Sequence, residues 1–242
     1  MRGPVAALFL IGTTQGTTAS PVDDSLAFAG FPPIPEYCAP LYTVQKRLCE
    51  VQHVYRCDAN GQTEWISVSL DTDDSLLLER SDAEGNTIDV WQDTGKLFFG
   101  YIENADAVSL SAARAEGSDT FDQTVLVMVP PFLDPLPTHM VGQFTRTSET
   151  LVLNDVTFER FALAVTMGVN SVVINFSGDM MVDRSSGAMV ESSLRVEAFG
   201  AVFKQNGALA QVIHPGESGF LGMSPAYDCD ATSDAAPDRR PA

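Results

Sequence analysis

Residues 172–202 carry the pattern that decides the fold. They read VVINFSGDMMVD (172–183), then RSSG (184–187) and, after Ala188, MVESSLRVEAFGAV (189–202). Apolar and polar residues alternate in both long segments, as they do in half-buried β-strands. The short polar segment between them is typical of a turn. The two segments are therefore predicted to form an antiparallel hairpin.

The alternation also predicts which side chains these strands bury. One face should meet a common core and consists of Val172, Ile174, Phe176, Val190, Leu194 and Val196. The other face should contact water and consists of Asn175, Ser177, Glu191 and Glu197. Helical periodicity is poor nearly everywhere, and we expect short helices only at Glu36–Leu48 and Ala105–Ala115.

Turn residues recur at short intervals along the rest of the chain. Asp58–Gly61 separates two strand-length runs, and Lys204–Gly207 ends in the Asn-Gly pair that favours a hairpin into Leu209–Ile213. Such spacing indicates an antiparallel meander. We predict an all-β protein with minor short helices, in which a large meander forms a curved sheet, a half-barrel or a β-sandwich.

The first 22 residues have the features of a secretory signal peptide. Arg2 precedes the apolar run Val5–Ile11, and small residues follow, so that cleavage is expected after Ala19. An apolar run of this length makes about 10 Å of helix, whereas a bilayer core is ~30 Å thick. We therefore predict no transmembrane helix. The protein is expected in the periplasm of a bacterium or outside the cell.

The four cysteines fit two structural disulfides in an exported protein. Residues 50–56 have the composition of extended chain, which would place Cys49 and Cys57 about 26 Å apart, whereas a disulfide needs ~6 Å. A direct bridge between these two is therefore excluded. One of them must pair with Cys229 and the other with Cys38, and the sequence leaves both assignments open. The sequence contains no C-x-x-C motif of the kind that would indicate a zinc site or redox chemistry.

These features divide the chain into a series of segments. They are a signal peptide (1–19), an N-terminal extension (20–35), one β-rich domain (36–229) and a disordered tail (230–242). Within the domain, halves 36–129 and 141–229 are joined by a proline-rich crossover, 130–140.

Composition excludes one class of partner. Acidic residues outnumber basic ones 32 to 14, and the net charge is −18. A phosphate backbone would repel such a chain, so we predict no nucleic-acid binding.

The sequence shows no catalytic, cofactor or metal motif. His53, His139 and His214 are far apart, and the loop around Ser218 does not have the spacing of a nucleophile elbow. The acidic turn at Asp71, Asp73 and Asp74, and that at Asp82, Glu84 and Asn86, lack the calcium-loop pattern. We expect turn capping at both and no enzymatic activity.

Four functions remain as hypotheses. The favoured one is an exported, non-catalytic binding or carrier protein with an apolar groove or cavity. Its partner would be a small apolar molecule or another protein. The alternatives are a structural or protein-interaction β-sandwich, a secreted hydrolase-type enzyme and a small outer-membrane β-barrel.

Overall fold

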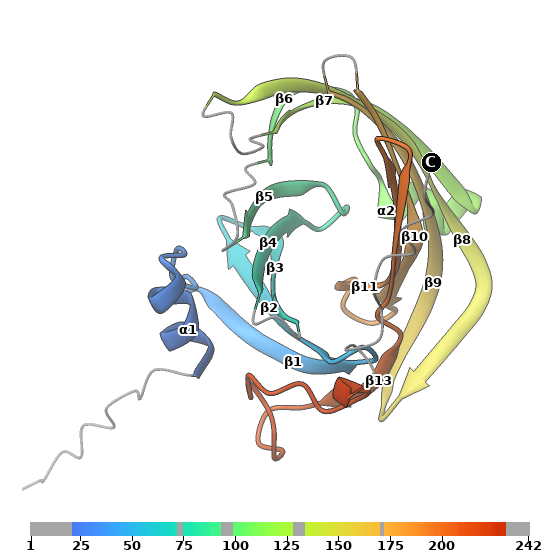
Figure 1. The fold of residues 1–242 in the computed structure, drawn as a ribbon. Helices are drawn as coiled ribbons and strands as arrows, with labels where there is room; N and C mark the ends of the chain where they lie inside the picture. The colour runs from blue at the N-terminus through green and yellow to red at the C-terminus, as the bar shows by residue number, and fades with distance from the viewer. Residues whose placement is uncertain (1–20, 72–74, 93–98, 128–133, 170–171, 231–242) are drawn as a thin grey trace, which may run out of the picture.

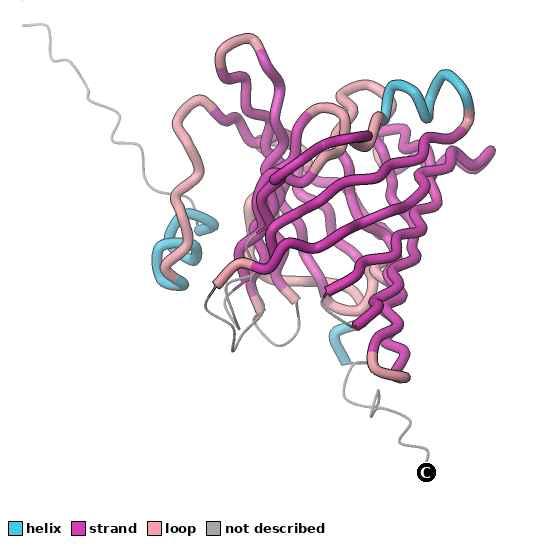
Figure 2. Tube along the Cα trace, turned by 90° about the horizontal axis from the view of Figure 1, so that it is seen from above, coloured by secondary structure: helices cyan, strands magenta, loops and turns pink. Residues whose placement is uncertain are grey.

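The computed structural model describes residues 21–71, 75–92, 99–127, 134–169 and 172–230. The predicted signal peptide and nearly all of the predicted tail lie outside these residues. The elements are α1 (Pro21–Ala29), β1 (Cys38–Lys46), β2 (Glu50–Ala59), β3 (Gln62–Leu70), β4 (Leu76–Asp82), β5 (Thr87–Gln92), β6 (Phe99–Asp106), α2 (Leu110–Glu116), β7 (Ser118–Val127), β8 (Leu136–Leu153), β9 (Val156–Val169), β10 (Val172–Asp183), β11 (Met189–Ala198), β12 (Ala201–Asn206) and β13 (Leu209–Ile213). Strands make up most of the described chain (Figure 2). The all-β prediction is confirmed.

The strands form two antiparallel sheets that do not close into a barrel. The smaller sheet has the order β13-β1-β2-β3-β4-β5, and the larger has the order β12-β11-β10-β9-β8-β7-β6. The larger sheet curves around one side of the smaller sheet (Figure 1). Both predicted halves of the chain contribute to the smaller sheet, because β13 pairs with β1. Strand β8 begins at Leu136, inside the segment predicted as a crossover.

Three hairpin turns were predicted, and one of them is wrong. The turns at Asp58–Gly61 and Arg184–Gly187 do join antiparallel neighbours. The Asn-Gly pair that ends Lys204–Gly207 instead lies where the chain crosses from β12 in the larger sheet to β13 in the smaller one. The hairpin turn falls earlier, at Phe199–Gly200, where both residues have positive φ. Pairing of β13 with β1 therefore overrides the local turn signal.

The helix predictions also need correction. Glu36–Leu48 forms strand β1 instead, because it has hydrogen-bonded neighbours on both sides and its end is buried on both faces. Of the second predicted region, Ala105–Ala115, only residues 110–115 are helical, as part of α2 (Leu110–Glu116). Ser109 accepts a hydrogen bond from Ala112 N at its start, and Gly117 ends it at positive φ. Helix α1 falls in the N-terminal extension, for which no structure was predicted.

Both ends of the described chain cover the outer face of the smaller sheet, the face turned away from the larger sheet (Figure 1). Val22 and Leu26 of α1 are fully buried against residues such as Tyr55 and Ile66. Residues 214–230, here called the C-terminal segment, follow the outer face of β1. Leu221 N donates to Thr43 Oγ1 at 2.9 Å, and Ala226 N donates to Gln45 Oε1 at 2.9 Å.

The two disulfides join Cys38 to Cys57 and Cys49 to Cys229. The predicted exclusion of a Cys49–Cys57 bridge is correct, and β2 is indeed extended between these residues. Cys38 and Cys57 are register partners on adjacent strands. The other bridge fixes the C-terminal segment to the start of β2.

A β-bulge changes the predicted faces of β11. Asp179 pairs with Ser193 but Met180 pairs with Glu191, so Ser192 is an extra residue. Glu191, predicted to contact water, consequently shares a face with Met180 and Leu194. Val190 lies on the opposite face, although it is fully buried there. On β10 the predicted alternation holds: Val172, Ile174 and Phe176 are half-buried, whereas Asn175 and Ser177 are exposed.

Candidate functional site

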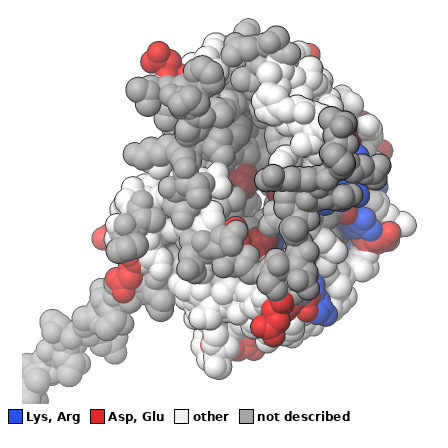
Figure 3. All heavy atoms as spheres, in the orientation of Figure 1, with Lys and Arg blue, Asp and Glu red and all other residues white. Residues whose placement is uncertain are grey.

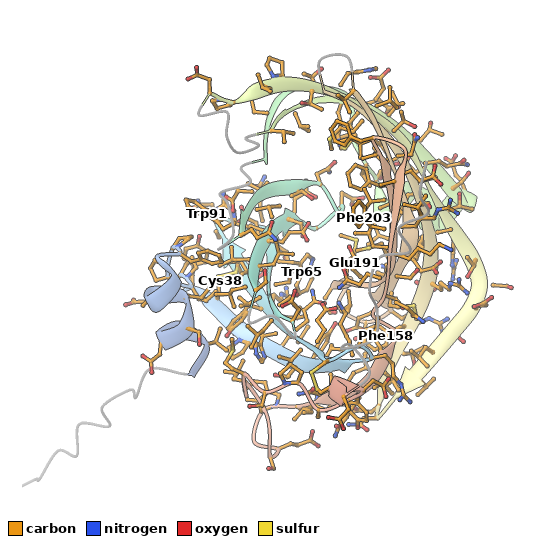
Figure 4. The ribbon with its side chains drawn as sticks, viewed as in Figure 1. Cys38, Trp65, Trp91, Phe158, Glu191 and Phe203 are labelled. Atoms are coloured by element: carbon orange, nitrogen blue, oxygen red, sulfur yellow. A yellow bond between two sulfur atoms is a disulfide. The ribbon has the colours of Figure 1, made fainter. Side chains whose placement is uncertain are left out.

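A cavity of about 410 Å³ lies between the facing sides of the two sheets. Glu191 projects into this space from β11, and Trp65 faces it from β3 (Figure 4). Acidic side-chain atoms are visible in the hollow near the centre of the molecule (Figure 3). The volume falls within the range of about 300–1,000 Å³ that is usual for small-molecule sites.

The wall formed by the larger sheet is mainly apolar. It presents Phe121, Met140, Phe144, Leu163, Val165, Met180, Met189 and Leu194. These side chains alternate with outward-facing neighbours, as the period of two requires. Flexible methionines suit such a wall because they adapt to ligands of different shape.

The wall formed by the smaller sheet is mainly polar. It presents Lys46, Glu50, Gln52, Ser67, Ser69, Glu79, Ser81, Thr87 and Gln92. Serine hydroxyls donate and accept hydrogen bonds, so this wall can bind polar groups of either kind. The cavity is therefore amphipathic across its width.

An ion pair closes the polar wall at one end. Lys46, the last residue of β1, contacts Glu50, the first residue of β2, and both side chains are more than 90% buried. Gln205 Nε2 donates to Glu50 Oε2 at 3.1 Å. Gly207 lies beside the pair, and a Cβ there would come within 3.2 Å of Glu50 Oε2. The lysine charge is thus compensated within the protein.

Two further carboxyl groups reach the cavity without an ion-pair partner among the described residues. Glu79 accepts a hydrogen bond from Thr87 Oγ1 at 2.9 Å. Burial raises the pKa of Glu79, while Thr87 and Lys46 oppose that rise. Burial also raises the pKa of Glu191, Lys46 lowers it, and the negative charges of Glu50 and Glu79 raise it further.

Buried polar atoms without partners also line the cavity. The side chains of Gln52 and Gln123 are 5% and 2% exposed, and neither Oε1 atom has a hydrogen-bond partner in the described structure. Trp65 Nε1 is likewise buried and unpaired. Leaving such atoms unsatisfied costs about 1–3 kcal/mol each. Two acceptors and one donor on side chains that line the cavity are therefore left without a hydrogen-bond partner in the described structure.

Helix α2 packs against residues of the apolar wall, but its own residues do not line the cavity. Leu110 and Ala113 are buried with Phe144 and Phe161, whose rings are stacked at 4.7 Å. The start of the helix is fixed by Glu84 Oε2, which accepts hydrogen bonds from Ser109 Oγ and Ser111 N. This contact keeps the Phe144 side of the wall in place.

Among the described residues that the sequence singled out as candidates for chemistry or disulfides, only Asp71 lines the cavity. The cysteines form the two disulfides. His53 is on the covered outer face, His139 contacts Asp122 at 2.6 Å, and His214 contacts Asp155 at 2.7 Å. The structure thus gives each histidine a different neighbour and brings no two of them together.

The acidic turns act as caps in the described structure. Asp82 Oδ1 accepts hydrogen bonds from Glu84 N and Asn86 N, and Asp71 Oδ1 accepts one from Ser75 N at 3.0 Å. Asp73 and Asp74 lie outside the described residues. Within the described ranges, no three His, Cys, Asp or Glu side chains are grouped so as to hold a metal ion.

Sequence reasoning missed the polar residues of the cavity. Lys46 was placed in a predicted helix, and Glu191 was placed on the wet face because a bulge has no sequence signal of its own here. Glu79 lies on a strand that the turn pattern did locate. Leu77 shares its face and Leu76 and Leu78 lie on the other, so alternation did not mark this side of β4 as polar.

No protein-family model, curated protein or solved structure matches the chain. In the part of the chain that the structure describes, no helix is both long and apolar enough to cross a membrane. What the protein does therefore has to be inferred from the residues of the cavity.

Proposed function

We propose that the protein is an exported, bacterial binding or carrier protein that holds a small, largely apolar molecule in the cavity between its sheets. The observation that carries this proposal is a cavity of about 410 Å³ with one mainly apolar wall. A purely structural sandwich would fill that space with side chains, because protein interiors are close-packed. Unpaired acceptors inside the cavity further support a ligand.

Export is supported by the two disulfides, which form and persist mainly in oxidising compartments. It also agrees with the predicted signal peptide. Protein recovered from the periplasm or medium of a bacterial host should show, by intact mass, loss of about the first 19 residues. Full-length, reduced protein in the cytoplasm would contradict this part of the proposal.

Binding can be tested with the neutral fluorophore N-phenyl-1-naphthylamine. We expect saturable fluorescence enhancement with the disulfide-bonded protein. Leu194→Trp, which fills the cavity from β11, should weaken binding by about tenfold or more. Arg195→Trp places the same side chain on the opposite, exposed face and should bind like the wild type. Equal binding by both variants would contradict the cavity as the site.

The exposed edge strand β12 favours a second candidate, a protein-interaction function. Phe199 and Phe203 are 83% and 62% exposed, and all six β12 residues are exposed. Such an edge can pair with a strand of another chain. If a second copy binds there, sedimentation should show a dimer that Phe203→Lys dissociates. A monomer at all concentrations would reject it.

A further inference from the structure

The charged groups of the cavity indicate the chemical class of its ligand. Four acidic residues, Asp71, Glu50, Glu79 and Glu191, and one basic residue, Lys46, line it among the described residues. The single ammonium group is already paired with Glu50, and Asp71 accepts a backbone hydrogen bond. Glu79 and Glu191 are left facing a largely enclosed space without a cation.

These two carboxyl groups come from opposite sheets, β4 and β11. Each is close enough to Lys46 for the lysine charge to affect its pKa, and Glu79 affects Glu191 directly. They therefore belong to one electrostatic site. A cation placed between them would relieve their mutual repulsion and the cost of burying them.

An independent observation points the same way. The unpaired oxygens Gln52 Oε1 and Gln123 Oε1 belong to side chains at least 95% buried, and they too lie on opposite sheets. Both oxygens are hydrogen-bond acceptors, as ionised carboxylates are, and Trp65 Nε1 is the one donor among the buried, unpaired side-chain atoms of the described lining. Two of these three buried, unpaired atoms are thus acceptors, which the N–H groups of a ligand would satisfy.

We propose that the ligand is a cationic amphiphile whose protonated amine binds between Glu79 and Glu191 while its hydrocarbon part lies on the apolar wall. This inference rests on the proposed function. An anionic amphiphile such as a fatty acid would instead place a carboxylate beside unpaired carboxyl groups, which repel it. Among the described residues no three His, Cys, Asp or Glu side chains are grouped so as to hold a metal ion, whereas two carboxyl groups on opposite walls suit a single protonated amine.

The test compares three probes of equal chain length: dodecylamine, dodecanol and dodecanoate. Each is titrated by calorimetry below its micelle concentration, at pH 7.5 and moderate salt. We expect dodecylamine to bind about tenfold or more tightly than the other two, because charge-assisted hydrogen bonds are roughly twice as strong as neutral ones. Dodecylamine affinity should also rise as pH rises above the ordinary pKa of a glutamate, because burial raises the pKa of Glu79 and Glu191, which face Lys46, Glu50 and Asp71 and ionise later than exposed carboxyl groups.

Variants separate the site from general attraction to an acidic protein. Glu79→Gln and Glu191→Gln should each remove most of the preference for dodecylamine while leaving dodecanol binding within about twofold. Glu197→Gln removes the same charge at the exposed end of the strand that carries Glu191, and it should leave all three affinities unchanged.

The outcomes distinguish this inference from the proposed function. Failure of all three probes and of N-phenyl-1-naphthylamine to bind would reject the cavity as a binding site. Three other results would overturn the inference that the ligand is a cation but leave the proposed binding function intact. They are equal binding of the three probes, tightest binding of dodecanoate, and a preference for dodecylamine that persists in Glu79→Gln and Glu191→Gln.

Discussion

The imidazole of His53 is fully buried on the outer face of the smaller sheet. Thr43 Oγ1 accepts a hydrogen bond from Leu221 N, and its own hydroxyl hydrogen can be donated to His53 Nδ1 at 3.0 Å. This arrangement fits a neutral ring with its proton on Nε2, which has no partner in the described structure. Burial lowers the pKa of His53 to about 4.

This lowered pKa predicts a loss of stability in mild acid. Between pH 6.5 and pH 4, His53 is protonated in the unfolded chain but stays neutral in the native protein. The free energy of unfolding therefore falls as pH falls. The expected contribution is about 3 kcal/mol between pH 7 and pH 4. Urea unfolding of wild type and His53→Gln measures it, because the stability difference between them should change by that amount.

His139→Gln is the control for this measurement, since His139 is exposed. Any pH-dependent difference from wild type that His139→Gln shows as well is not specific to the buried His53. If the His53→Gln difference changes by less than about 1 kcal/mol, the ring is not held neutral by burial.

Glu191 carries a pH effect of the opposite sign. Its folded pKa is raised by burial, so its favourable contribution is present at low pH and is lost as pH rises through that pKa. Glu191→Gln should therefore stabilise the protein at pH 8, by about 1 kcal/mol, and by less at pH 4.5. Urea unfolding at the two pH values checks this, and Glu197→Gln should show neither effect. A loss of stability at pH 8 would contradict it.

Such a gain on substitution is expected where function is maintained at the expense of stability. The sequence could not have shown it. Period-two alternation from Val196 back to Glu191 assigns the glutamate to water, and only the extra residue Ser192 turns it into the cavity. Gly178, opposite the bulge, fits because a Cβ there would meet Ser193 O at 2.1 Å.

At the scale of elements, one carboxylate connects helix α2 to the larger sheet. Glu159 on β9 is buried and contacts Arg114 of α2, Arg146 of β8 and Arg184, which follows β10. Arg114 also donates to Asp183 O at 3.2 Å. These contacts hold the helix against Phe144 and so support the apolar wall of the cavity.

We expect Glu159→Gln to lower the free energy of unfolding by about 2 kcal/mol, because three arginines would lose their partner. Their partial exposure keeps the cost below that of a fully buried pair. Glu149→Gln, which removes an exposed partner of Arg160, should cost less than about 0.5 kcal/mol. Guanidinium unfolding measures both. Equal effects would mean that the Glu159 contacts add nothing to stability.

The positions of the strands were easier to predict from the sequence than the pairing between them. Alternation located β10, β11 and the turn at Arg184–Gly187, because these depend on neighbours in the sequence. The pairing of β13 with β1 joins residues about 170 positions apart, and no local pattern reports it. Strand β1 also pairs with β2, its neighbour in the sequence, but its other edge is covered by β13.

For the whole molecule, the cavity exists only because two sheets are held face to face, which no single strand pattern determines. The sequence predicted apolar alternation and one long-range disulfide. It did not predict that the inner face of the smaller sheet would be polar and enclosed, since Ser67, Ser69 and Glu79 read as ordinary water-facing residues. On the outer face, the side chains under α1 form an apolar cluster, whereas Thr43 and Gln45 bind the backbone of the C-terminal segment.

The Cys49–Cys229 bridge should be the larger of the two covalent contributions to stability. It spans 180 residues, whereas Cys38–Cys57 spans 19. In the chain-entropy model these loops contribute about 5 and about 3 kcal/mol. Denaturant unfolding of the double alanine variants of each bridge, under identical conditions, should reproduce that order. The reverse order would show that chain entropy does not govern either bridge.

Removing the same bridge should also change His53, although the two are not in contact. The C-terminal segment reaches Thr43 through Leu221 N, and Tyr227 O accepts a hydrogen bond from Cys49 N beside the bridge. Without the covalent link the segment should open locally and admit water to the histidine. The pKa of His53, followed by NMR, should then rise from about 4 toward 6.5 in Cys49→Ala/Cys229→Ala and stay low in Cys38→Ala/Cys57→Ala. An unchanged pKa in the first variant would mean that the hydrogen bonds of the segment hold it in place without the disulfide.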